Sequence, residues 1–362
     1  MVEAIVKEIE ATRPPLFPPK GEEIPKNESE MNAKDTREII STLYFGGGTP
    51  SILNIDELKL IFEALYKRFV FADDIEITLE ANPDDITELK LMEWKDTGIN
   101  RLSVGIQSFL EEELIWMNRA HTAAESITCI DLIKKAGFTN FSVDLIYGSP
   151  ILSDDDWKRN VALVIEKNIP HISCYALTVE PKTALDKMIA LNKKEPVDAE
   201  KQAHQFLLLM NWMEQAGYEH YEISNFAKPG LRSKHNSSYW SAEPYYAFGP
   251  AAHAFDGKSR RWNIANNSLY IQSLQQNIIP FEEEILTETQ QLNEYIMTSL
   301  RTMEGLDLDF ISNIFGEEKS SRILVACSRY ESTGRLKLIN RNLILTKEGK
   351  LFADGIAADL FF

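Results

Sequence analysis

The chain has 362 residues, of which 44% are hydrophobic and 26% charged, so we expect a large core and more than one domain. Its 38 basic and 55 acidic residues leave a formal net charge of -17, which disfavours the phosphate backbone of nucleic acid as a partner. No apolar run reaches the ~20 residues that a membrane-spanning helix needs. We therefore predict a cytoplasmic protein with no transmembrane segment and no nucleic-acid partner.

Residues 1–11 predict an amphipathic helix without an N-cap, so the chain begins inside this helix and we expect that upstream sequence is absent. A segment rich in Pro, Glu and Lys, residues 12–38, predicts a mobile surface loop. The sequence then alternates short β-branched or aromatic runs with amphipathic helical stretches, a pattern typical of a parallel sheet. The predicted strands are 41–47, 75–82, 101–108, 140–148 and 171–179, and the predicted helices are 56–70, 86–97, 110–136, 154–167 and 198–216.

The last third of the chain changes character. Residues 218–255 are rich in aromatics, Asn, Ser, Gly and Pro, and predict ordered loops or short antiparallel strands. From residue 287 the pattern is helical and ends in a probable hairpin, 335–339 with 342–346, followed by a helix. This order resembles a winged helix, but 9 basic and 11 acidic residues over 287–362 favour a packing role over DNA binding.

Polar residues follow the predicted strands at the edge where parallel α/β folds bind ligands. Three glycines and a threonine, Gly46–Thr49, end the first run and allow a ligand to approach the backbone closely. Carboxylate or amide side chains end three later runs, and an arginine follows a short helix, where it suits a ligand carboxylate. These candidates are Glu80, Gln107, Asp144 and Arg119.

Five motifs in this order resemble the radical S-adenosylmethionine (SAM) proteins related to oxygen-independent coproporphyrinogen III oxidase: YFGGGTPSIL, EANPDDIT, RLSVGIQSF, VDLIYGSP and KHNSSYW. The HN-x-x-YW pattern at 235–240 is similar to the mark of the haem chaperone branch. The resemblance implies an α/β fold, a partial (β/α)6 barrel that binds SAM and a [4Fe-4S] cluster. We therefore expect a barrel over 1-216, an aromatic connecting and haem-loop region over 217-286, and a winged-helix-like α+β domain over 287-362.

The resemblance also implies roles for individual residues. It places Gly47, Gly48 and Thr49 at the methionine end of SAM. His235 matches the residue proposed as a haem-iron ligand, although a single His in a loop is more often structural. Further SAM contacts are implied for Glu80, Gln107, Arg119 and Asp144.

The three cysteines of the chain do not match the family. They are Cys129, Cys174 and Cys327, too widely spaced for a disulfide framework or a cluster, so we predict buried apolar side chains. The family's first strand and its three-cysteine loop are missing, which leaves 41–47 as an unpaired, apolar sheet edge and predicts lowered stability or solubility. Two explanations are open: the start codon is misassigned or the gene truncated, or the protein is a natural paralogue without a cluster. The presence of all the implied SAM contacts favours a misassigned start codon or truncated gene.

Three functions follow from these observations. The first is a haem chaperone-like protein that binds haem and SAM and serves haem-accepting proteins, with a [4Fe-4S] cluster only if a missing N-terminal segment is restored. The second is a coproporphyrinogen III oxidase-like radical enzyme of porphyrin biosynthesis. The third is a non-catalytic paralogue or gene fragment. In the chain as given, no residue set predicts SAM cleavage.

Overall fold

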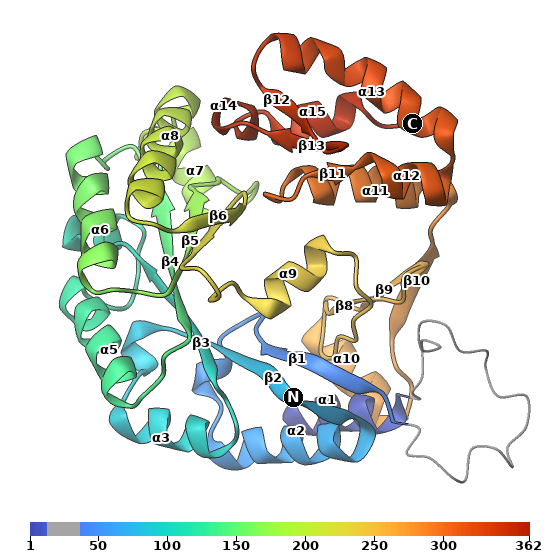
Figure 1. Ribbon diagram of the computed structural model, residues 1–362. Coiled ribbons are helices and arrows are strands. Elements are labelled where there is room, and N and C mark those ends of the chain that lie inside the picture. Colours follow the sequence, from blue (N-terminus) through green and yellow to red (C-terminus); the bar gives the residue numbers. More distant parts are fainter. Residues whose placement is uncertain (13–36) are drawn as a thin grey trace, which may run out of the picture.

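The computed structural model describes residues 1–12 and 37–362. Its largest sheet curls into a partial barrel of seven strands in the order β1-β2-β3-β4-β5-β7-β6 (Figure 1). The first five strands are parallel, and the last two continue the sheet in antiparallel fashion. Their bounds are β1 (Ile39–Phe45), β2 (Val70–Ala81), β3 (Arg101–Gln107), β4 (Phe141–Tyr147), β5 (His171–Ala176), β6 (Glu219–Glu222) and β7 (Asn225–Ala227).

Helices cover the convex face of this sheet (Figure 1). Two of them, α2 and α5, begin at capping boxes in which an Asn or Thr and a Glu three residues later satisfy each other's backbone N–H groups. The helices and 3-10 turns between the strands are α2 (Ile55–Arg68), α3 (Glu88–Asp96), α4 (Glu111–Trp116), α5 (Ala123–Lys135), α6 (Asp154–Glu166), α7 (Ala184–Ala190), α8 (Ala199–Gln215), η2 (Pro50–Ile52) and η3 (Pro83–Asp85).

The side chains of the central strands alternate between an apolar convex face and a polar concave face. The convex positions are buried under the helices, together with large side chains such as Trp94 and Trp157, and form the main hydrophobic core. Because side chains on a strand alternate with a period of two, the intervening residues face the inside of the curl. Glu76, Glu80, Arg101, Ser103, Ser142, Asp144, His171 and Ser173 occupy these intervening positions.

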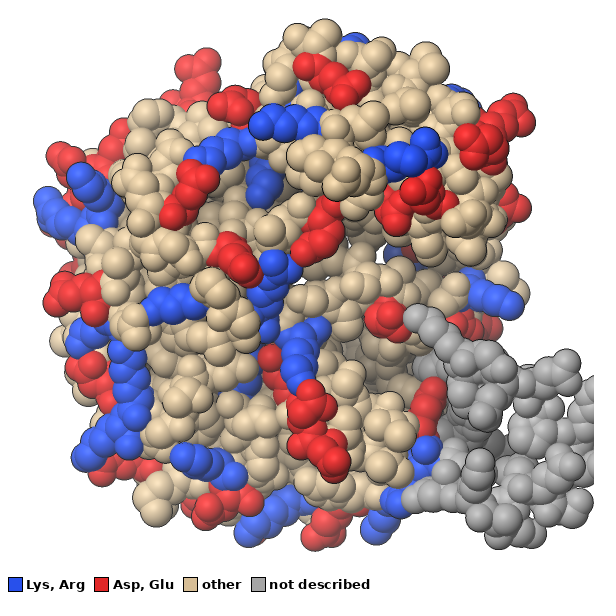
Figure 2. Space-filling view, in the orientation of Figure 1, with Lys and Arg blue, Asp and Glu red and all other residues tan. Residues whose placement is uncertain are grey.

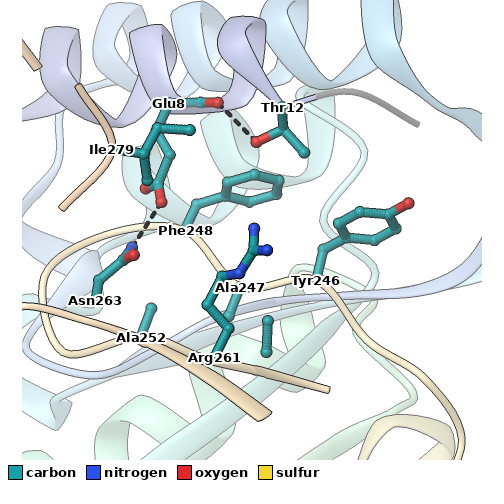
Figure 3. Close-up of a pocket in the computed structure, with 10 residues that line it drawn as sticks. Glu8, Thr12, Tyr246, Ala247, Phe248, Ala252, Arg261, Asn263 and Ile279 are labelled. Atoms are coloured by element: carbon teal, nitrogen blue, oxygen red, sulfur yellow. Dashed lines mark hydrogen bonds between the residues drawn. The ribbon is translucent and has the colours of Figure 1, made fainter. Parts of the chain in front are cut away.

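The N-terminal helix α1 (Val2–Ala11) packs on α2 and against a segment that follows the barrel. This segment contains α10 (Asn267–Gln275) and a sheet of β8 (His253–Phe255), β9 (Ser259–Asn263) and β10 (Phe281–Ile285). The buried Glu8 carboxylate joins the two parts by accepting hydrogen bonds from the Gly249 N–H, the Asn263 amide and the Tyr270 hydroxyl. Glu8 also borders a small cavity with Tyr246, Phe248 and Arg261 (Figure 3).

A short helix, α9 (Lys234–Trp240), lies on the concave side of the curled sheet, beside β1 (Figure 1). The C-terminal elements form a separate unit, seen at the top of Figure 1. It consists of α11 (Glu288–Leu300), β11 (Leu306–Asp307), α12 (Leu308–Phe315), α13 (Glu317–Ser332), β12 (Leu336–Ile339), β13 (Asn342–Leu345), α14 (Lys347–Lys350) and α15 (Ala353–Asp359). This unit joins the barrel through a hydrogen bond from the Met303 N–H to the Tyr221 carbonyl and through Lys350, whose amine lies 2.9 Å from His220 Nδ1.

Several predictions from the sequence are confirmed. The strand–helix alternation, the C-terminal hairpin and the following helix are present, and all three cysteines are free and buried. Strand β1 stands at one edge of the sheet formed by the described residues. No helix in residues 1–12 and 37–362 is long and apolar enough to cross a membrane.

Other predictions were wrong in detail. The single helix predicted over 110–136 is two helices, because residues 117–122 leave the helix and return to it at a new cap. The HN-x-x-YW motif, predicted in a loop, forms helix α9, which the Ser233 hydroxyl caps. The predicted mobile loop, 12–38, lies almost entirely outside the described residues.

Acidic and basic side chains are interspersed over the face of the molecule in Figure 2.

Candidate functional site

The glycine loop that follows β1 is shaped by three different glycines. Gly47 and Gly48 have φ angles of 74° and 149°, a region that favours glycine. Gly46 has no such angle, but a Cβ there would lie 2.6 Å from the Tyr44 ring and 2.8 Å from Glu80 Oε1. The absence of a side chain at Gly46 therefore leaves Glu80 its position at the end of β2.

Glu80 accepts a hydrogen bond of 2.8 Å from the Tyr44 hydroxyl through Oε1. Both side chains belong to the concave face, Tyr44 from β1 and Glu80 from β2, and both are half-buried. Burial and the neighbouring Glu80 carboxylate raise the pKa of Tyr44, so the phenol stays protonated and remains a donor. A carboxylate has two acceptor oxygens, so Glu80 can also accept a hydrogen bond from a ligand.

Asp144 lies on β4 at the level of Ser173 on β5. The pKa of Asp144 is raised to about 6: burial raises it most and the Glu80 carboxylate adds to the rise, while the Ser173 hydroxyl and two arginines, Arg101 and Arg119, lower it. Within the described part of the chain, Asp144 Oδ1 is buried without a hydrogen-bond partner. A buried carboxylate oxygen without a partner is costly, so a ligand that donates a hydrogen bond there would relieve that cost.

Arg119 follows α4 and reaches back over β3. Its Nη2 donates to Asn82 Oδ1 at 3.1 Å and to the Gly105 carbonyl at 3.3 Å, while its buried Nε has no partner in the described residues. A Cβ at Gly105 would lie 3.0 Å from Gln107 Nε2, a tight contact, and 3.6 Å from Nη2 of Arg119, an ordinary one. Gln107 ends β3 with a φ of 68°, a conformation that non-glycine residues seldom adopt and that is concentrated at functional sites.

The structure brings most of the predicted residues to one mouth of the curled sheet. Glu80 and Arg119 are both close enough to Asp144 to influence its pKa, and Gln107 lies beside Arg119 across Gly105. The glycine loop joins this group through the contact between Gly46 and Glu80. Thr49 is the N-cap residue of η2, directly after the loop, and makes no side-chain capping bond. Two carboxylates and a guanidinium with open hydrogen-bonding sites suit a ligand that carries hydroxyl, ammonium and carboxylate groups together.

His235 lies on α9 and contacts the ring of Tyr44, whose hydroxyl donates to Glu80. The His235 ring stacks on the Tyr44 ring, with centroids 4.7 Å apart and an interplanar angle of 17°. Its Nδ1 lies 3.0 Å from Thr42 Oγ1 and its Nε2 lies 3.1 Å from the Tyr239 hydroxyl. Burial lowers the pKa of His235 to about 4, against an opposing effect of Glu76, so the imidazole is neutral at physiological pH.

The cysteines do not fit an iron–sulfur cluster. Cys129 lies in α5, Cys174 in β5 and Cys327 in α13, and all are buried in hydrophobic clusters. Burial raises the pKa of Cys129 and Cys327 to about 12, which opposes the thiolate form that binds iron. Among the described residues, no three His, Cys, Asp or Glu side chains gather closely enough to hold a metal ion.

Comparisons with known proteins agree with this arrangement. The radical SAM superfamily matches residues 9–164, and the HemN C-terminal domain matches residues 286–352. A relative from Bacillus subtilis (strain 168), named heme chaperone HemW, is 31% identical over 327 residues, which cover 90% of this chain and 86% of the relative. This chain belongs to the HemW family.

A second member of the HemW family, from Escherichia coli (strain K12), is 29% identical to this chain over 334 residues and covers 88% of it, with 83% of that relative aligned. The solved structure of the radical SAM enzyme coproporphyrinogen III oxidase (HemN) from Escherichia coli superposes with a TM-score of 0.79 at 20% identity, over 99% of this chain and 82% of that one. This likeness shows the fold. The radical SAM superfamily implies SAM and a [4Fe-4S] cluster. The unpartnered Asp144 Oδ1 and Arg119 Nε fit the first group, whereas the three buried cysteines do not fit the second.

Sequence reasoning missed several residues that shape the site. Tyr44, Asn82 and Gly105 each contact a predicted ligand residue, yet none stands out by type. The position of Tyr44 could have been predicted, because it shares one face of the strand with Thr42 and lies directly before the glycine loop. The hydrogen bond from Arg119 to Asn82 could not have been predicted from the sequence, because it depends on how α4 packs against the sheet.

Proposed function

We propose that this protein is a haem chaperone that binds haem iron through the His235 imidazole and holds SAM at the adjoining strand ends. The observation that carries this proposal is the setting of His235. It is a neutral imidazole fixed on both sides, by ring stacking on Tyr44 and by the Thr42 hydroxyl at Nδ1.

A fixed, neutral imidazole is well suited to bind a metal. When one ring nitrogen is held by a hydrogen bond, the other nitrogen is oriented and available as the ligand. Thr42 holds Nδ1, which leaves Nε2 for iron once the Tyr239 hydroxyl moves away. Tyr239 is 42% exposed, so its hydroxyl can turn toward solvent when iron takes its place at Nε2.

Aromatic rings around α9 supply a surface for a porphyrin. Tyr239 packs edge-on against Tyr245 with centroids 4.8 Å apart, and Tyr245 in turn lies near Phe255. Flat aromatic side chains stack on planar apolar ligands and still offer hydroxyl groups at the rim. The names of the relatives from Bacillus subtilis and Escherichia coli support haem as the planar ligand and haem-accepting proteins as partners.

For SAM, we propose the contacts implied by the family: Gly47, Gly48, Thr49, Glu80, Gln107, Arg119 and Asp144. The unpartnered Asp144 Oδ1 and Arg119 Nε support this proposal, because a ligand with a hydrogen-bond donor and a carboxylate would satisfy both. When bound, a [4Fe-4S] cluster supplies the electron that cleaves SAM in this superfamily. The cysteines of this chain do not fit such a cluster, so we derive no radical step for it.

The test is a haemin titration of the purified protein, followed by the Soret band, for the parent, H235A and a control. H204A is the matched control, since His204 is exposed on α8 and pairs with Asp154 away from α9. We expect H235A to shift the Soret maximum and weaken haem binding at least tenfold, about 1.4 kcal/mol, while H204A matches the parent. An identical Soret band and affinity in H235A would exclude His235 as the iron ligand.

A further inference from the structure

The first turn of α9 is hydrogen-bonded to the side chain of Glu76, which lies on the concave face of β2. Glu76 Oε1 accepts hydrogen bonds from the His235 N–H at 3.0 Å and the Ser233 hydroxyl at 3.2 Å, and Oε2 accepts from the Lys234 N–H at 3.2 Å. Ser233 Oγ in turn accepts from the Asn236 N–H. The first N–H groups of a helix have no partner within the helix, so Glu76 and Ser233 together satisfy those that would otherwise be buried unpaired.

Glu76 is itself fixed in place. Its side chain is 4% exposed, and its Oε2 lies 3.8 Å from Nε of Arg101, whose side chain is 1% exposed. Both residues lie on neighbouring strands, β2 and β3, so their backbones are held by the central sheet. The Glu76 carboxylate accepts three hydrogen bonds and lies beside a buried guanidinium. Moving the carboxylate would leave a buried charge without its partners, so we expect its position to be fixed.

Glu76 and Glu80 are four residues apart on β2 and so share its concave face. Each holds one part of the surroundings of His235. Glu76 holds the backbone N–H of His235, and Glu80 holds the hydroxyl of Tyr44, on whose ring the imidazole stacks. Neither carboxylate hydrogen-bonds the imidazole nitrogens, which face Thr42 and Tyr239. Glu76 therefore acts on the position of the ring through the backbone, and its charge also opposes the lowering of the pKa of His235 by burial.

We propose that Glu76 is a positioning residue for haem binding, which sets the place of the His235 imidazole by anchoring the first turn of α9. This inference rests on the proposed function. An exchange to glutamine keeps the shape of Glu76 but turns one acceptor oxygen into an NH2 group, which then faces an N–H or O–H donor. The helix start must shift to avoid that contact, and the imidazole moves with it.

The experiment is a double-mutant cycle in the full chain, with haemin titration of the parent, E76Q, H235A and the double variant E76Q/H235A. We expect E76Q to weaken haem binding about tenfold in the parent and to change its Soret shape. In the H235A background the same exchange should change haem affinity less than twofold, because the ligand that Glu76 positions is gone. E113Q is the control: Glu113 is also a buried carboxylate, on α4, where it accepts a hydrogen bond from the Ser149 hydroxyl, and we expect parent-like haem affinity.

The outcomes are distinct. If E76Q weakens haem binding equally with and without His235, its effect is general destabilisation and the inference is overturned; the same holds if E76Q binds haem as the parent does while H235A does not. If H235A itself is parent-like, the proposed function fails and the inference falls with it. Should E76Q not fold, S233A replaces it, with an expected loss of about threefold that must again depend on His235.

Discussion

The buried carboxyl of Asp144 makes the stability of this protein depend on pH in a way that one substitution removes. Burial raises its folded-state pKa to about 6, against an ordinary value of 3.8. Between these two pH values the folded state holds a proton that the unfolded state has already released, so stability falls as pH rises from about 4 to about 6. A difference of about two pKa units corresponds to about 3 kcal/mol at neutral pH.

D144N removes this titration and keeps the shape of the side chain. We expect D144N to be more stable than the parent by about 1–3 kcal/mol at pH 7.5, and the difference to fall below about 1 kcal/mol near pH 4, where the folded carboxyl is neutral and the unfolded one is only partly ionised. The assay is urea unfolding followed by tryptophan fluorescence at intervals from pH 4 to pH 8, without SAM. D73N, at an exposed site on β2, is the control and should follow the parent within about 0.5 kcal/mol.

A free-energy difference between D144N and the parent that stays constant from pH 4 to pH 8 would refute the reasoning, because no titration would then separate them. The stabilisation should also carry a functional cost. If Asp144 accepts a hydrogen bond from SAM, D144N binds SAM more weakly by calorimetry although it is the more stable protein, as is common where a site is built from buried polar groups.

Two more predictions follow from close packing. G46A should weaken SAM binding more than tenfold by calorimetry, because its Cβ would lie within 3 Å of the Tyr44 ring and the Glu80 carboxyl, whereas G355A, with open space around its Cβ, should bind as the parent does; equal binding by both would contradict the expected clash. All three cysteine thiols are buried and should react with a thiol reagent only after unfolding, so fast labelling of the native protein would show that one is exposed.

The parallel sheet could be predicted from the sequence because strands and helices leave local patterns of apolar and polar residues. Period-two alternation around Glu80 and Asp144 identified strands whose polar residues end at one edge, and the order of strands and helices then required a parallel sheet. The predicted ends of helices and strands were less accurate. Helix capping by Thr122 splits one long helical pattern into α4 and α5, and this break has a local signal, a Thr with a Glu three residues later.

The surroundings of His235 could not be predicted in the same way. Helix α9 has seven residues, too few for a helical period to be read, and its stability comes from Glu76, 159 residues earlier in the chain. The stacking of His235 on Tyr44 spans a similar distance. Such contacts depend on how the sheet curls, which is set by twist and register and not by residue type.

The attachment of α1 has a consequence for how the chain is made. The three donors to the Glu8 carboxylate come 241, 255 and 262 residues later in the sequence. At about 5–20 residues per second, ribosomal synthesis would need roughly 10–50 s to supply them. During that interval α1 can pack on α2, but its buried Glu8 carboxylate lacks all three of its final hydrogen-bond donors, so this helix is fully secured only late in synthesis.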